Sequence, residues 1–84
     1  MQSINELEEY YNKYIKEQME GIEYIHRGAI GEGIYNTNNK TALIKENNKI
    51  VFYKIINNLA YEKNSFNYSD MYKSICFFIN YKEE

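Results

Sequence analysis

Hydrophobic and polar residues follow a helical period at both ends of the chain and an alternating period between them. Near the N-terminus the apolar residues recur at the spacing of one helix face; they are Ile4, Leu7, Tyr11, Tyr14 and Ile15. Ser3 followed by Glu6 forms a capping box, and Gly21 is typical of the position just beyond a helix. The pattern predicts an amphipathic helix over residues 4–20.

The last part of the chain returns to the helical period. One side carries Tyr68, Met71, Tyr72, Ile75, Ile79 and Lys82. Asn67 or Ser65 is the expected N-cap, and Asp70 lies in the first turn, where an acidic residue suits the helix dipole. A second helix is therefore predicted over residues 67–82.

Three Asn-Asn pairs divide the middle of the chain at nearly even spacing: Asn38-Asn39, Asn47-Asn48 and Asn57-Asn58. Asn tolerates positive φ, which two-residue hairpin loops require at both central positions. The runs between the pairs, "KTALIKE" and "KIVFYKII", are rich in β-branched and aromatic residues. We predict an antiparallel meander with strands near 33–37, 40–46, 49–56 and 59–63. The run "IEYIHR", residues 22–27, adds a fifth strand to a sheet that spans residues 22–63.

A two-residue turn at Asn47-Asn48 sets the strand register. It places Glu46 opposite Lys49, Ile44 opposite Val51, and Leu43 opposite Phe52. One sheet face then carries Tyr35, Ala42, Ile44, Val51, Tyr53, Ile55 and Ala60. The other carries Ile34, Leu43, Ile50, Phe52, Ile56, Leu59 and Tyr61, interleaved with Lys45, Lys54 and Lys63. Both faces are apolar in the middle, unlike a sheet with one face in water.

Together these patterns predict a single α+β domain over residues 1–84, with an N-terminal helix, an antiparallel four- to five-stranded meander and a C-terminal helix. A chain of 84 residues has a small core. Two helices cover one face of such a sheet, so we expect the second apolar face to exceed what the chain covers alone.

The segment "HRGAIGEGIY" holds Gly28, Gly31 and Gly33 and admits two interpretations. As a phosphate-binding loop, "IGEGIY" followed by "ALIK" is similar to the start of a protein kinase. However, Asn36 replaces the third glycine and no catalytic loop or "DFG" follows. As turn chemistry, Gly28 and Gly31 bracket a turn between two strands, and Gly33 permits a bulge or a close backbone approach. We favour the turn, and leave open whether it is also a contact loop.

The charge balance disfavours nucleic acid as a partner. The chain carries nine lysines and one arginine against eleven glutamates and one aspartate, for a net charge of −2. Nucleic-acid binders present a basic face and use Arg for phosphate and base contacts, and here Arg27 is the sole arginine.

The sequence also bears on location. The longest apolar run, "ICFFI", is far shorter than a membrane span, and the acidic N-terminus lacks the apolar core of a signal peptide. Cys76 is the single cysteine, so no internal disulfide forms. We expect a cytoplasmic protein without a membrane partner, in the host cytoplasm if a phage encodes it.

The chain offers little for catalysis. His26 is the only histidine, with Glu23 and Arg27 nearby in sequence, and a lone histidine on a strand is usually a surface or packing residue. A zinc site needs several Cys or His ligands, and Cys76 is expected to be an inert buried thiol. We expect no enzyme activity, no cofactor and no metal.

Aromatic residues off the predicted core are the candidates for partner contact. On the C-terminal helix, Asp70, Ser74, Phe77 and Tyr81 form a stripe opposite the predicted core stripe. Core-like positions are assigned to Tyr11, Tyr14, Tyr53, Tyr68 and Tyr72. Tyr is enriched at interface hot spots. The predicted contact residues are Phe77, Tyr81, Asp70, Tyr10, Tyr24, Tyr35 and Tyr61.

The expected function is a non-catalytic module that binds another protein. Small acidic single-domain chains are typical of inhibitors encoded by phages and other mobile elements, among them anti-CRISPR proteins. Such an inhibitor would contact the basic groove of a host defence nuclease. Two alternatives stay open. One is a structural homodimer joined through the second sheet face. The other is a nucleic-acid-binding regulator that uses Lys45, Lys54 and Lys63 beside Phe52 and Tyr61.

Overall fold

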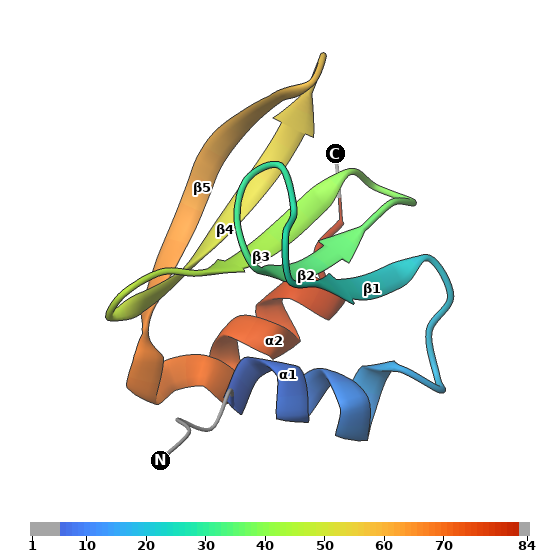
Figure 1. Ribbon diagram of the computed structural model, residues 1–84, viewed down its shortest axis with the longest axis vertical. Coiled ribbons are helices and arrows are strands. Elements are labelled where there is room, and N and C mark those ends of the chain that lie inside the picture. Colours follow the sequence, from blue (N-terminus) through green and yellow to red (C-terminus); the bar gives the residue numbers. More distant parts are fainter. Residues whose placement is uncertain (1–5, 83–84) are drawn as a thin grey trace.

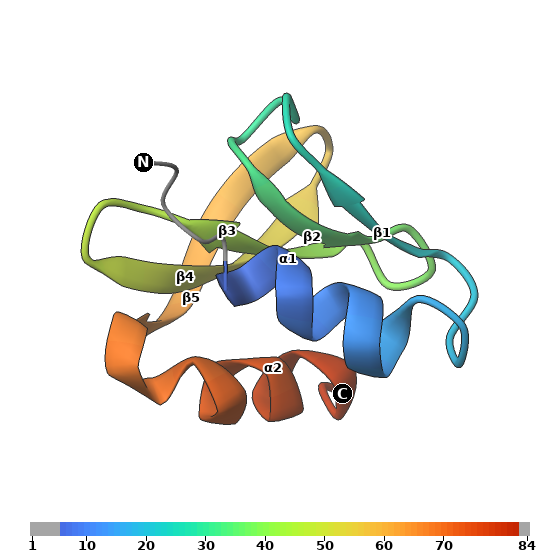
Figure 2. The same cartoon turned by 60° about the horizontal axis from the view of Figure 1, so that its bottom comes forward.

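The chain folds into one sheet with a helical layer on one side. A computed structural model describes residues 6–82. The elements in chain order are α1 (Glu6–Tyr10), the π-helical turn η1 (Tyr11–Ile15), β1 (Ile22–Ile25), β2 (Gly33–Asn36), β3 (Thr41–Lys45), β4 (Lys49–Ile56), β5 (Leu59–Asn67), the 3-10 turn η2 (Tyr68–Asp70) and α2 (Met71–Ile79). The strands form an antiparallel sheet of order β1-β2-β3-β4-β5, and both helices lie against the same face (Figures 1 and 2). The predicted α+β architecture is confirmed.

The register of the central hairpin is also confirmed. Ile44 pairs with Val51 and Leu43 with Phe52. The backbone N–H of Glu46 donates to the carbonyl oxygen of Lys49 at 2.9 Å, which closes the turn. The alternation of side chains therefore assigns each central residue to the predicted sheet face.

The three Asn pairs all lie at chain reversals, but they do not turn the chain in the same way. Asn57 and Asn58 have φ of 52° and 66°, as a two-residue hairpin of this kind requires. At the turn after β2 the positive φ, 56°, belongs to Lys40 instead. Elsewhere in residues 6–82 no Asn has positive φ. The predicted conformation was thus right at one pair and wrong at the other two.

Strand β5 is longer than predicted. It runs beyond residue 63 to Asn67 because it pairs with the whole of β4, ending with Asn67 opposite Lys49. Phe52 is opposite Asn64 whereas Tyr53 is opposite Glu62, so Lys63 is an extra residue in a β-bulge. The helical segment that follows has Asn67 as its N-cap, as predicted, but it opens with the 3-10 turn η2, so α2 itself begins at Met71.

The N-terminal helix contains a π turn that the sequence pattern did not predict. The N–H of Lys16 donates to the carbonyl of Tyr11 at 2.9 Å, a five-residue bond that adds one residue to the turn. This extra residue aligns Leu7 with Ile15, and both are buried. It turns Tyr14 out of the predicted core stripe, to 47% exposure. The predicted capping residue Ser3 lies outside the described residues.

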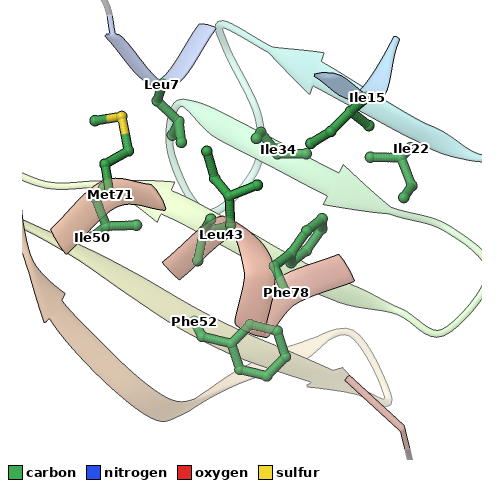
Figure 3. Packing of buried hydrophobic residues seen from close by; sticks show 10 residues of the cluster. Leu7, Ile15, Ile22, Ile34, Leu43, Ile50, Phe52, Met71 and Phe78 are labelled. Carbon is green, nitrogen blue, oxygen red and sulfur yellow. The ribbon is translucent and has the colours of Figure 1, made fainter. Parts of the chain in front are cut away.

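The core lies between the helical layer and the sheet. Its ten buried members are Leu7, Ile15, Ile22, Ile34, Leu43, Ile50, Phe52, Met71, Ile75 and Phe78 (Figure 3). On α2 the buried side consists of Met71, Ser74, Ile75 and Phe78. Ser74 is tolerated there because its Oγ donates to the carbonyl of Met71 at 2.6 Å. Phe78 thus occupies the core, whereas Tyr72, predicted to be core, is 63% exposed.

The centre of the second sheet face is covered by the segment between β1 and β2, residues 26–32, called here the covering loop. It folds over the face opposite the helices (Figures 1 and 2). Beneath it Ala42, Ile44 and Val51 are at most 2% exposed. The expectation that this apolar face is left uncovered was therefore wrong for its centre, because the seven residues of the covering loop shelter it from solvent.

Tyr35 holds the covering loop in place. Its hydroxyl donates to the carbonyl of Gly31 at 2.6 Å. The same oxygen accepts the backbone N–H groups of Ile30 at 3.3 Å and Gly31 at 3.2 Å. A half-buried hydroxyl that satisfies three backbone groups fixes the loop conformation.

Gly33 is required by the spacing of two strands, so its substitution tests the fold. A Cβ at this position would overlap the carbonyl oxygen of Leu43 and lie 2.8 Å from Cα of Ile44. Both atoms belong to the backbone of β3, which cannot move aside as a side chain can. We expect Gly33→Ala to lower the free energy of unfolding by about 3 kcal/mol, measured by urea denaturation.

Gly28→Ala is the matched control for that substitution. Its Cβ would meet the ring and hydroxyl of Tyr35, a side chain that can turn aside at the cost of its hydrogen bonds to the covering loop. We therefore expect a loss of stability that is smaller than the loss from the backbone overlap at Gly33. Equal stability of Gly33→Ala and the wild type would show that β2 and β3 do not approach this closely.

Candidate functional site

His26, the central residue considered for catalysis, contacts side chains of α1 and β1. His26 is an exposed residue, and its Nε2 lies 3.2 Å from Oε1 of Glu8 on α1. Its ring packs edge-on against Tyr24 with centroids 5.0 Å apart. Within residues 6–82 no cluster of three or more His, Cys, Asp or Glu side chains is placed to hold a metal ion. The contacts of His26 link the sheet to α1.

The glycine-rich segment acts as a turn. The N–H groups of Ile30 and Gly31 point to the hydroxyl of Tyr35, so they are engaged inside the protein. A phosphate-binding loop directs such groups toward its ligand. The geometry supports the turn interpretation.

Phe77 and Tyr81 close the edge of the core instead of facing away from it. The Phe77 ring is edge-on to Phe52, with centroids 5.1 Å apart, and lies 5.6 Å from Phe66 of β5. The Tyr81 ring lies 4.9 Å from Phe52. The predicted stripe is therefore not opposite the core. It lies on the flank of α2 that faces β5, and its member Ser74 is fully buried.

The other predicted contact residues divide into internal and surface positions. The hydroxyl of Tyr24 donates a hydrogen bond to the carboxylate of Glu32. The hydroxyl of Tyr35 donates to the carbonyl of Gly31 in the covering loop. Asp70 and Tyr61 are exposed, Tyr61 to 46%. Tyr10 is half-buried and belongs to an aromatic cluster that the sequence pattern missed.

This cluster, called here the aromatic surface, consists of Tyr10, Tyr14 and Tyr72. The ring of Tyr10 lies 5.6 Å from that of Tyr14 and 6.3 Å from that of Tyr72. Tyr10 thus bridges the N-terminal helical segment and α2, which run along the same side of the sheet (Figure 2). Tyr14 and Tyr72 are 47% and 63% exposed. Only the π turn and the phase of α2 bring these residues to the surface, and neither has a clear signature in the sequence.

A groove of about 350 Å³ adjoins the aromatic surface. It is lined by Glu6, Glu9, Tyr10, Lys13 and Tyr14. Nζ of Lys13 lies 5.7 Å from the centre of the Tyr14 ring, within the range of a cation–π contact. Two carboxylates beside two phenol rings form an environment that favours a cationic side chain.

A second exposed apolar group lies at the end of the β4–β5 hairpin. Ile56, Leu59 and Tyr61 are 45%, 58% and 46% exposed. The last residue of β4 that pairs with β3 is Lys54, so residues 55–60 extend past the rest of the sheet (Figure 1). We call residues 55–60 the hairpin tip.

Two of the five residues of the proposed platform of lysines and aromatics lie inside the protein. Phe52 is fully buried beneath the helices, and Lys54 is 7% exposed, with Nζ donating to the carbonyl of Asn39 at 2.6 Å. Lys63 is displaced by the bulge. Phe52 and Lys54 are therefore not available to contact a nucleic acid, contrary to that alternative.

Comparison with known proteins identifies no relatives. The chain matches no protein-family model, and neither curated proteins nor solved structures give a significant match. Among residues 6–82, none of the helices has the length and apolar character needed to cross a membrane.

Tyr53 gives the second sheet face a measurable pH dependence. Its hydroxyl donates to Oε2 of Glu46 at 2.8 Å. This hydrogen bond, followed by burial, raises the pKa of Tyr53 to about 12 from 10.0. The folded state therefore keeps the phenol proton at a pH where the unfolded chain has lost it. The stabilisation is complete below about pH 10 and disappears as the pH rises toward about 12.

We expect the stability advantage of the wild type over Tyr53→Phe to be about 1 kcal/mol at pH 8. It should shrink between pH 10 and 12 in denaturant titrations. Tyr61→Phe, at an exposed tyrosine, serves as the control. An advantage that stays constant across this range would contradict the role of the Tyr53–Glu46 hydrogen bond.

Proposed function

We propose that the chain is a non-catalytic module that binds another protein through its aromatic surface. The observation that carries the proposal is the contact between three tyrosine rings, two of which expose about half of their area or more. Tyrosine combines a large rigid ring with a polar tip, and it dominates many interface hot spots. Exposed apolar groups that gather in one place indicate contact with another molecule.

The surroundings of the aromatic surface favour a basic partner. Glu6 and Glu9 line the adjoining groove, and the chain carries a net charge of −2. Lys13 already makes a cation–π contact with the Tyr14 ring, so the ring offered to a Lys or Arg side chain of a partner is the more exposed Tyr72. A nuclease with a basic nucleic-acid groove, inhibited by a small phage-encoded protein of the anti-CRISPR type, has this chemistry. Such a nuclease is the partner that we propose.

A photo-crosslinking experiment tests this function. A photoreactive phenylalanine analogue replaces Tyr72 in one variant and Tyr61 in another, and both are expressed in cells. We expect the variant with the analogue at position 72 to crosslink to a partner protein. The same variant should capture less of that protein when Tyr14→Ser is added. With the purified partner, the Tyr14→Ser/Tyr72→Ser double variant should raise Kd by about a hundredfold, the range of a hot spot.

Both tyrosines are exposed, so the double variant is expected to keep the wild-type circular dichroism spectrum and melting temperature. Binding of the partner with wild-type affinity by this folded double variant would overturn the proposed surface.

A further inference from the structure

The hairpin tip is the least supported part of the sheet. Its pairing with β3 ends at Lys54, and one further backbone bond, from the N–H of Ile55 to the carbonyl of Lys40 at 2.8 Å, ties it to the turn before β3. Beyond Ile55 the backbone pairing is between β4 and β5 alone. One face of the tip carries Ile56 and Leu59, and the opposite face carries Ile55 and Ala60. A two-stranded hairpin without a third strand or a covering layer is marginally stable in water. Its apolar side chains therefore need a contact that the single chain does not provide.

An apolar groove lies directly beside the tip. It measures about 500 Å³, and it is bounded by Ala29 and Ile30 of the covering loop, by Tyr35, and by Ile55, Leu59 and Ala60 of the hairpin. None of the residues that line it carries a charge, although 26% of the chain is charged. The groove continues past Tyr35, Ile55 and Asn58 into a neighbouring hollow near the turn after β2.

We propose that the occupant of this groove is the hairpin tip of a second copy of the chain. The protruding apolar tip and the apolar groove lie side by side, and residues of the tip form one wall of the groove. A two-fold axis passing between them would place each tip in the other groove, which is the condition for a closed, isologous dimer. Ile55 and Ala60 of each copy would then pack against those of the other, and Leu59 would reach Ala29 and Ile30 of the partner's loop.

Charge and edge geometry favour this arrangement over other contacts. An uncharged groove imposes no repulsion between two identical acidic chains, and it offers nothing to select a charged partner. The outer edge of β5 is interrupted by the bulge at Lys63, and a bulge with a lysine disfavours continuation of a sheet from edge to edge. The two copies therefore meet through the sheet faces of their hairpins.

This inference is independent of the proposed function, because the aromatic surface and the hairpin tip lie on different elements. The dimer leaves Tyr10, Tyr14 and Tyr72 free to bind another protein. Loss of self-association and loss of partner binding are consequently expected from different substitutions.

Sedimentation equilibrium over a concentration series tests the dimer. We expect a reversible monomer–dimer equilibrium for the wild type. Leu59→Asp should raise the dissociation constant by about a hundredfold, because a two-fold interface loses the contact of this leucine twice. Tyr72→Asp is the matched control: Tyr72 and Leu59 are 63% and 58% exposed, and the control should leave the dimer unchanged.

A cysteine crosslink provides a second readout. In the Cys76→Ser background, Ala60→Cys should form a disulfide-linked dimer under mild oxidation much faster than Ser65→Cys, an exposed position on the same strand beyond the bulge. A monomer at all concentrations, a dimer insensitive to Leu59→Asp, or equal crosslinking at both positions would each overturn the proposal.

Discussion

The fold depends on covering both apolar faces of a central sheet with a short chain. Two helical segments cover one face and contribute five of the ten core residues. The covering loop shelters the centre of the other face, where Ala42, Ile44 and Val51 are buried. The loop does this because the Tyr35 hydroxyl satisfies its backbone groups and holds it over the strands. A loop of seven residues thus replaces a further layer of secondary structure.

The limited reach of this covering accounts for where the chain exposes apolar surface. The loop shelters the middle of β3 and β4 on one face, and on the other face the helical layer leaves Ile56 and Leu59 of the hairpin tip exposed. The helical layer lies along one face of the sheet (Figures 1 and 2). It seals the core and leaves Tyr14 and Tyr72 of the aromatic surface exposed. The two proposals concern these separate ends: a basic protein partner at the aromatic surface, and a second copy of the chain at the hairpin tip.

The sheet could be predicted from the sequence because its determinants are local. Alternation of side chains and the spacing of the Asn pairs fix the strands and the Leu43–Phe52 register. The buried face of each helix could not be predicted as well, because the spacing of apolar residues does not by itself fix which of them turn toward the sheet. The π turn moved Tyr14 outward, and on α2 the core position against Phe52 of β4 is taken by Phe78, whereas Tyr72 is exposed. The position of the covering loop depends on contacts between residues distant in sequence, such as Gly31 over Ile44, for which the glycine spacing gave only the turn.

The most direct test removes the covering loop while preserving the strands. Ile25 and Gly33 are already opposite each other, so replacing residues 26–32 with Asn-Gly joins β1 to β2 by a two-residue hairpin. If the loop covers the second face, this variant should lose about 3 kcal/mol of unfolding free energy and bind a hydrophobic dye strongly, because Ile44 and Val51 become exposed. Wild-type stability without dye binding would contradict the central claim that this loop completes the fold.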